Sequence, residues 1–196
     1  MFDALSHTQS TAPDQSSDDT PDIDDVIDSR PVTVTIVGDS MIRGVAPLVS
    51  GPDIDAVGFV YPGRTARQIN ARFRNIPETD ITVIAAGTNN TESHSLDQCK
   101  SDMSAVIDNV SKKRSNGHVV ISCIPYRFDK PELNPKIDLI NDHIESQIKN
   151  RSNWHLLRND GIIPEDYKKD KLHFNETGLV LFALEVRHIC RLIMRE

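Results

Sequence analysis

The chain has 196 residues, of which 38% are hydrophobic and 26% are charged, a composition typical of a globular protein with one domain. No apolar run approaches the length of a membrane-spanning helix, and the first residues lack the basic and apolar stretches of a secretory signal, so we expect a reduced, intracellular protein. The three cysteines, Cys99, Cys123 and Cys190, lack metal-ligand spacing, so neither a disulfide framework nor a structural zinc site is expected.

The negative charge is concentrated in the first 30 residues. This segment contains eight Asp and one Arg and accounts for the whole net charge of −7, whereas the other 166 residues carry 21 acidic and 21 basic side chains. With few large apolar residues, it cannot bury enough surface to offset the entropy of ordering. We therefore expect a disordered acidic tail over 1–30 and one folded domain over 31–196. Because the domain has no basic excess, direct nucleic-acid binding is not expected.

Short apolar runs alternate with helix-period segments along the rest of the chain. The expected elements are strands over 32–37, 54–60, 81–86, 118–124 and 154–157, and helices over 41–49, 65–74, 96–114, 137–148 and 177–194. Strands that alternate with helices predict a parallel sheet covered on both faces. We expect a flavodoxin-like three-layer α/β/α sandwich with five strands in the order 2-1-3-4-5. In this architecture the loops after strands 1, 2 and 3 gather at one edge of the sheet.

A candidate nucleophile, Ser40, follows the first strand in the tripeptide Gly38-Asp39-Ser40. At a helix start the backbone N–H groups are unpaired, and the N–H of the serine itself can face the oxyanion that its attack creates. The alternative is that Ser40 or Asp39 merely caps the helix. The surrounding residues do not form Gly-x-Ser-x-Gly, which excludes the nucleophile elbow of the α/β-hydrolases.

A candidate base, His173, lies three residues after Asp170 and just before the last helix. At this spacing the carboxylate can bond to Nδ1 of the imidazole and leave Nε2 facing outward, as a serine nucleophile requires. The alternatives are a local Asp–His pair without chemistry or a metal site, for which two ligands are too few.

Two further residues could donate hydrogen bonds to a developing oxyanion. Gly63 offers a backbone N–H with no side chain in the way, and Asn89 offers its side-chain amide. Taken singly, Gly63 reads as part of a Pro-Gly turn and Asn89 as an ordinary loop residue.

Taken together, the motifs resemble the four blocks of the SGNH (GDSL-type) hydrolases. The matching residues are Gly38-Asp39-Ser40, Gly63, Gly87-Thr88-Asn89 and Asp170-x-x-His173, and the resemblance covers about residues 32–194. It implies a serine esterase that uses no metal or other cofactor and acts on a small ester such as a lipid or an acetylated sugar. It further implies Ser40 as nucleophile, His173 as base and Asp170 as the group that orients it. Ser40, Gly63 and Asn89 would form the oxyanion hole.

The chain departs from the pattern of that family at two positions. Met41 stands where the first block often has Leu, and Asn90 stands where the third block often has Asp. The first change conserves volume, whereas the second removes a charge and bears on the geometry of the loop.

The segment 124–129, with Leu133-Asn134 and Ile140-Asn141, also resembles the esterase-like domains encoded in non-LTR retrotransposons. This second resemblance leaves open the alternative of a weak or inactive module with a binding or nucleic-acid-associated role. Arg43 and Arg64 flank the candidate site; each could bind a substrate carboxylate or phosphate, or simply lie at the surface.

Overall fold

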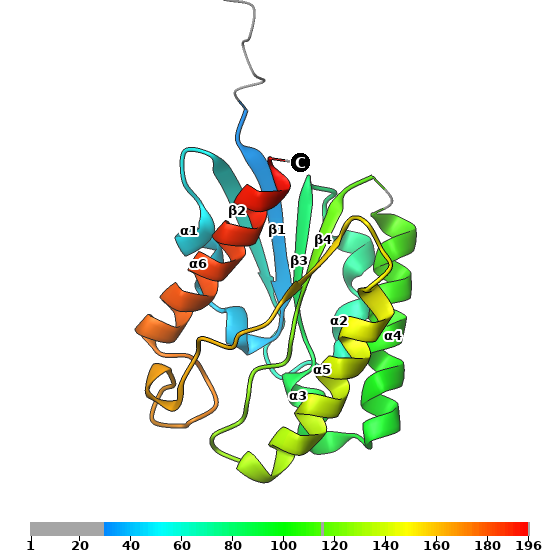
Figure 1. Ribbon diagram of the computed structural model, residues 1–196, viewed down its shortest axis with the longest axis vertical. Coiled ribbons are helices and arrows are strands. Elements are labelled where there is room, and N and C mark those ends of the chain that lie inside the picture. Colours follow the sequence, from blue (N-terminus) through cyan, green and yellow to red (C-terminus); the bar gives the residue numbers. More distant parts are fainter. Residues whose placement is uncertain (1–29, 115, 196) are drawn as a thin grey trace, which may run out of the picture.

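The structure, a computed structural model, describes residues 30–114 and 116–195 (Figure 1). The predicted disordered tail therefore lies outside the described residues, apart from Arg30. A single five-stranded sheet forms the centre, and all its paired strands are parallel, in the order β2-β1-β3-β4-β5. The strands are β1 (Val32–Gly38), β2 (Ile54–Val60), β3 (Ile81–Ala85), β4 (His118–Ser122) and β5 (Trp154–Leu157). The predicted fold class and strand order are confirmed.

Helices cover both faces of the sheet, and each face has its own apolar core (Figure 1). Helices α1 (Val45–Val49) and α6 (Glu176–Ile193) lie on one face, whereas α2 (Ala66–Asn70), α4 (Leu96–Lys113) and α5 (Asn134–Ile148) lie on the other. Along β1, Ile36 faces the first core and Val37 the second, so both faces of the strand are covered. No helix in the described residues is both long enough and apolar enough to cross a membrane.

Three local predictions were wrong. The single helix expected over 41–49 is a 3₁₀ helix at Ser40–Ile42 followed by α1, because Gly44 adopts a left-handed φ of 89° between them. The helix expected over 65–74 is the short α2 followed by a 3₁₀ helix at Phe73–Asn75. The residues after β3, expected as a loop, form α3 (Thr88–Ser93), so Asn89 lies in the first turn of a helix.

The end of β1 is held close to its neighbours in the sheet. A Cβ atom on Gly38 would lie 2.0 Å from the carbonyl oxygen of Ala85 in β3, so only glycine fits here. The N–H of Asp39 donates to the same carbonyl oxygen at 3.1 Å, and the N–H of Tyr61 donates to the carbonyl of Gly38 at 2.8 Å. The loops that leave β1 and β2 are thereby fixed side by side, next to Ser40.

Candidate active site

Ser40 is the first residue of a 3₁₀ helix, and Asp39 is its cap. One carboxylate oxygen of Asp39 accepts a hydrogen bond from the N–H of Met41 at 3.0 Å. Met41 and Ile42 are buried and anchor the turn in the core. Because Asp39 performs the capping, the hydroxyl of Ser40 is left for another partner. The capping alternative therefore applies to Asp39 and not to Ser40.

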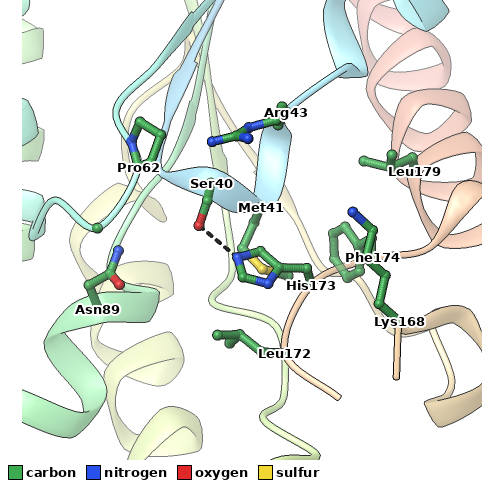
Figure 2. A pocket seen from close by; sticks show the side chains of 11 residues that line it. Ser40, Met41, Arg43, Pro62, Asn89, Lys168, Leu172, His173, Phe174 and Leu179 are labelled. Carbon is green, nitrogen blue, oxygen red and sulfur yellow. Dashed lines mark hydrogen bonds between the residues drawn. The ribbon is translucent and has the colours of Figure 1, made fainter. Parts of the chain in front are cut away.

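The partner of Ser40 is His173, which lies 133 residues further along the chain (Figure 2). The Ser40 Oγ lies 3.0 Å from Nε2 of His173, and Nδ1 of the same ring lies 2.8 Å from Oδ2 of Asp170. Because an ionised carboxylate only accepts hydrogen bonds, the ring proton sits on Nδ1, and Nε2 accepts from the serine hydroxyl. The three predicted residues thus form one continuous chain of hydrogen bonds.

Asp170 is the anionic end of this chain. Desolvation raises its pKa, but hydrogen bonds from the His173 N–H, the His173 ring and the Leu172 N–H outweigh that effect and bring the pKa down to about 2. Both backbone N–H groups donate to Oδ1 at 3.0 Å, so the second oxygen is free for the imidazole. The carboxylate is therefore ionised at any pH at which His173 could act as a base.

A tight turn holds Asp170 and His173 in this arrangement. The N–H of Lys168 donates to the carbonyl of His173 at 2.7 Å, and the N–H of Lys171 donates to the carbonyl of Lys168 at 2.8 Å. Within this turn Lys171 adopts a φ of 56°, which is uncommon for a residue with a side chain. Surrounding contacts must hold this backbone in place, because such a conformation costs of order 1–3 kcal/mol.

Part of that support comes from the loop after β4. The N–H groups of Phe128 and Asp129 both donate to the carbonyl of Lys171, at 3.1 and 3.0 Å. Buried Arg127 makes two side-chain hydrogen bonds to the Asp129 carboxylate, which fixes this loop. Sequence reasoning did not assign Arg127 a role, because nothing local connects it to a turn more than 40 residues away.

The segments that resemble the esterase-like domains of non-LTR retrotransposons stabilise the same loop after β4. The Asn141 side chain pairs with both backbone groups of Ile124, at 2.8 and 3.0 Å, and the Asn134 side chain does the same with Arg127. Two asparagines of α5 thus fix the loop after β4, and this loop in turn supports the turn that carries His173.

Three candidate oxyanion donors lie around Ser40. Within the part of the chain that the structure describes, the backbone N–H groups of Ser40 and Gly63 donate to no protein acceptor. The Asn89 side-chain nitrogen donates one hydrogen to the carbonyl of Arg64 at 3.0 Å, which leaves its second hydrogen free. Figure 2 shows Asn89 and Pro62 on the same side of Ser40, opposite His173.

The turn that presents Gly63 requires glycine for its backbone. The N–H of Arg64 donates to the carbonyl of Tyr61 at 3.2 Å, with Pro62 and Gly63 at the two central positions and a φ of 68° at Gly63. This is the arrangement of a type II turn, whose third residue needs a positive φ. Gly63 can therefore both complete the predicted Pro-Gly turn and offer its backbone N–H as the predicted oxyanion donor.

Asn90 takes part in a buried polar network. Its side-chain oxygen accepts from the N–H of Ala66 at 2.8 Å, and its nitrogen donates to Asp102 at 2.9 Å and lies 3.1 Å from Nδ1 of His94. The Asn90 side chain thus links α2, α3 and α4. An Asp at this position would place a second negative charge against the buried carboxylate of Asp102. The surroundings of Asn90 therefore favour Asn over the Asp that is frequent in the family pattern.

Asp39 is fully buried beneath the site. Desolvation raises its pKa to about 6, although the N–H of Met41, the polar groups of Thr88 and the proximity of His173 act in the opposite direction. Within the described residues, its second oxygen, Oδ2, accepts no hydrogen bond of normal geometry. Ionisation of the buried Asp39 carboxyl group therefore destabilises the folded protein.

A pocket of about 510 Å³ opens over Ser40 (Figure 2). Sequence reasoning missed most of its apolar lining, which consists of Met41, Pro62, Leu172, Phe174 and Leu179. It also missed Lys168, whereas Arg43 lines the pocket as anticipated. Asp170 and His173 belong to no group of three or more metal-binding side chains in the described residues.

In comparisons by sequence, no protein-family model and no curated protein matches the chain. Solved structures do match it in fold. A family 3 carbohydrate esterase from Clostridium thermocellum has a TM-score of 0.70 at 18% identity, over 85% of this chain and 98% of that one. An acetyl esterase mutant, S10A, with an acetate ion has a TM-score of 0.69 at 16% identity, over 84% and 98%.

A GDSL-like lipase from Bacteroides thetaiotaomicron has a TM-score of 0.67 at 17% identity, over 82% of this chain and 88% of that one. Each of these three similarities in fold extends over at least 82% of this chain. The chain has the fold of the GDSL/SGNH lipases, acylhydrolases and carbohydrate esterases.

Proposed function

We propose that the protein is a serine esterase that hydrolyses a carboxylic ester with a short acyl group through an acyl-enzyme on Ser40. The observation that carries the proposal is the chain of hydrogen bonds from Ser40 through His173 to Asp170, at 3.0 and 2.8 Å, at the floor of an open pocket. A hydroxyl, an imidazole and a carboxylate in this order make a serine nucleophilic at neutral pH.

In the proposed reaction, Ser40 Oγ attacks the ester carbonyl while Nε2 of His173 takes its proton. Asp170 keeps the ring in the required tautomer and stabilises the imidazolium that forms. The negative charge on the carbonyl oxygen is stabilised by the N–H groups of Ser40 and Gly63 and by the Asn89 amide. His173 then protonates the leaving alcohol, and in the second half of the cycle it activates water to release the acid from Ser40.

Two observations support an ester as substrate. The three residues that carry the candidate donors come from separate elements and line one pocket, which a simple binding site for a neutral ligand does not need. The structures similar in fold are described as an acetyl esterase, a carbohydrate esterase and a lipase. The acetyl esterase among them is the reason to propose an acetyl or another short acyl group.

Turnover of p-nitrophenyl acetate by the purified full chain tests the proposal. We expect wild type to hydrolyse this ester and the variants Ser40→Ala and His173→Ala to lose about 10⁴-fold or more in kcat. Wild type without measurable turnover, or variants that retain it, would contradict the proposal. A fold that is intact by circular dichroism but has no turnover would favour the alternative of an inactive binding module.

A further inference from the structure

Two cationic side chains line the pocket of Ser40, whereas none of its lining residues is Asp or Glu. The cations are Arg43 and Lys168, and both side chains are exposed at the mouth. The folded domain as a whole carries equal numbers of acidic and basic residues. The local excess of positive charge is therefore a property of this pocket and not of the protein surface in general.

Two other cations in the loops around the site have partners among the described residues. Arg127 pairs with Asp129, and the Lys171 ammonium donates to a backbone carbonyl. The guanidinium of Arg43 and the ammonium of Lys168, by contrast, have no hydrogen bond or ion pair with any residue in 30–114 and 116–195. Both positive charges thus remain available to a ligand.

Backbone hydrogen bonds fix the residue that carries each cation next to one of the reacting residues. Arg43 ends the 3₁₀ helix that begins at Ser40, and its N–H donates to the carbonyl of Ser40 at 3.3 Å. Lys168 is tied to the carbonyl of His173 at 2.7 Å. In Figure 2 the Arg43 side chain extends toward Ser40 and Pro62, and Lys168 lies on the other side of His173, near Phe174.

We propose that this site takes acyl esters whose alcohol portion carries an anionic group, a carboxylate or a phosphate. The inference rests on the esterase function proposed above. His173 must lie within hydrogen-bond reach of the leaving oxygen to protonate it, so the alcohol portion occupies the His173 side of the pocket. Lys168 projects from that side and is the direct partner expected for the anion, whereas Arg43, on the Ser40 and Pro62 side of the same pocket, adds a second positive charge with a planar fork that fits carboxylate or phosphate oxygens.

A series of acetate esters with different charge on the alcohol tests this inference. The esters 4-acetoxybenzoate and 4-acetoxyphenyl phosphate carry an anion, 4-acetoxybenzamide is neutral, and (4-acetoxyphenyl)trimethylammonium carries a cation. The acyl group is the same in all four, and each kcat/KM is divided by the rate constant for hydrolysis of that ester by hydroxide. The two anionic esters show whether carboxylate or phosphate is preferred.

We expect wild type to prefer the anionic esters over the amide by about tenfold and to disfavour the cation, with the preference shrinking as salt is added. Arg43→Gln and Lys168→Gln should each lower kcat/KM for the preferred anion about fivefold more than for the amide. Lys169→Gln is the matched control, because Lys169 is exposed and adjacent to Lys168 but does not line the pocket.

The possible failures are distinguishable. Equal turnover of all four esters, or equal losses for the anion and the amide in the two variants, would overturn the inference and leave the esterase proposal intact. A preference that Lys169→Gln removes as strongly as Lys168→Gln does would also overturn it. If none of the esters is hydrolysed, the esterase proposal fails and the inference fails with it.

Discussion

The described part of the chain contains two serine–histidine pairs with nearly the same hydrogen-bond length. Ser40 and His173 are 3.0 Å apart at the carboxyl edge of the sheet, and Ser104 of α4 lies 2.8 Å from Nε2 of His143 in α5. Judged by this contact alone, the second pair is as good a candidate as the first. The difference between them lies in what surrounds the contact.

The pair between α4 and α5 lacks each of the other groups that the chemistry needs. In the described residues, no carboxylate hydrogen-bonds to His143, and Ser104 lines neither the pocket over Ser40 nor any of four other pockets. Ser104 lies inside a long helix, where its N–H is used by the helix itself and cannot face an oxyanion. The comparison teaches that a serine–histidine contact becomes a candidate nucleophile only through its third residue, its free donors and its access to a ligand.

The sharpest test of the comparison is covalent labelling of the two serines. A fluorophosphonate probe should label Ser40 at least about 10⁴-fold faster than Ser104, because only Ser40 has an oriented base and free oxyanion donors. Mass spectrometry of the labelled peptides identifies the site. Ser104→Ala should leave labelling and ester turnover within about twofold of wild type. Equal labelling of both serines would show that Ser40 is no more nucleophilic than Ser104.

Removal of the third residue should make the first pair resemble the second. Asp170→Asn keeps an oxygen for the two backbone N–H groups but loses the anion that holds the His173 tautomer. We expect kcat for p-nitrophenyl acetate to fall about 10³-fold, with little change in thermal stability because the side chain is half exposed. Unchanged kinetics in Asp170→Asn would exclude this carboxylate from the reaction.

Removal of one donor should have a smaller effect. Asn89→Ala deletes the side-chain amide near Ser40, and we expect a loss of about 10²-fold in kcat with little change in KM. Ser93→Ala, on the exposed side of the same helix α3, is the control and should retain full activity. A loss confined to KM would mean that Asn89 binds substrate equally in the ground state and in the transition state.

The pH dependence of stability distinguishes the sheet edge from the helix pair. Because the pKa of Asp39 is raised to about 6 from an ordinary value of 3.8, the unfolded chain ionises first as pH rises. The free energy of unfolding should therefore fall between pH 4 and 6, by about 3 kcal/mol at most. Asp39→Asn keeps the cap and should remove this fall, so that it is more stable than wild type at pH 8 and similar at pH 4.

The control for this prediction is Asp142→Asn, a change at an exposed residue beside His143, which should leave the pH profile as it is in wild type. Chemical unfolding monitored by circular dichroism across the pH range measures both variants. If the free energy of unfolding changes with pH in the same way in wild type and in Asp39→Asn, burial of the ionised Asp39 does not destabilise the protein.

The smallest effect concerns the network beside α3. Asn90→Asp places a second carboxylate against buried Asp102 and should lower the free energy of unfolding by about 2 kcal/mol. The exchange Asn90→Asp with Asp102→Asn restores one donor and one acceptor and should recover most of the loss. Unfolding curves for the two single variants and the double variant measure the coupling. Strict additivity would mean that these side chains do not interact.

The sequence by itself determined the strands and their order. The segment 32–37 is β-branched at every position and Ile81–Ala85 is almost wholly apolar, as expected of parallel strands buried on both faces, and this pattern is readable without a structure. The stripe of Ile140, Ile144 and Ile148 likewise marks α5, although α5 begins three residues earlier than the periodicity predicts. The motifs also placed Ser40, Gly63, Asp170 and His173 in the turns or helix start where the structure has them, whereas Asn89, expected in a loop, lies in the first turn of α3.

Only the tertiary structure decided which of these residues meet. Hydrophobic periodicity is a local signal, whereas the contact of Ser40 with His173 depends on where a distant turn packs against the carboxyl edge of the sheet. The support of Lys171 by the loop after β4, the pairing of Asn90 with Asp102 and the unpaired ammonium of Lys168 depend on the same packing. Residues far apart along the chain become neighbours through the sheet, and no spacing in the sequence encodes their distance.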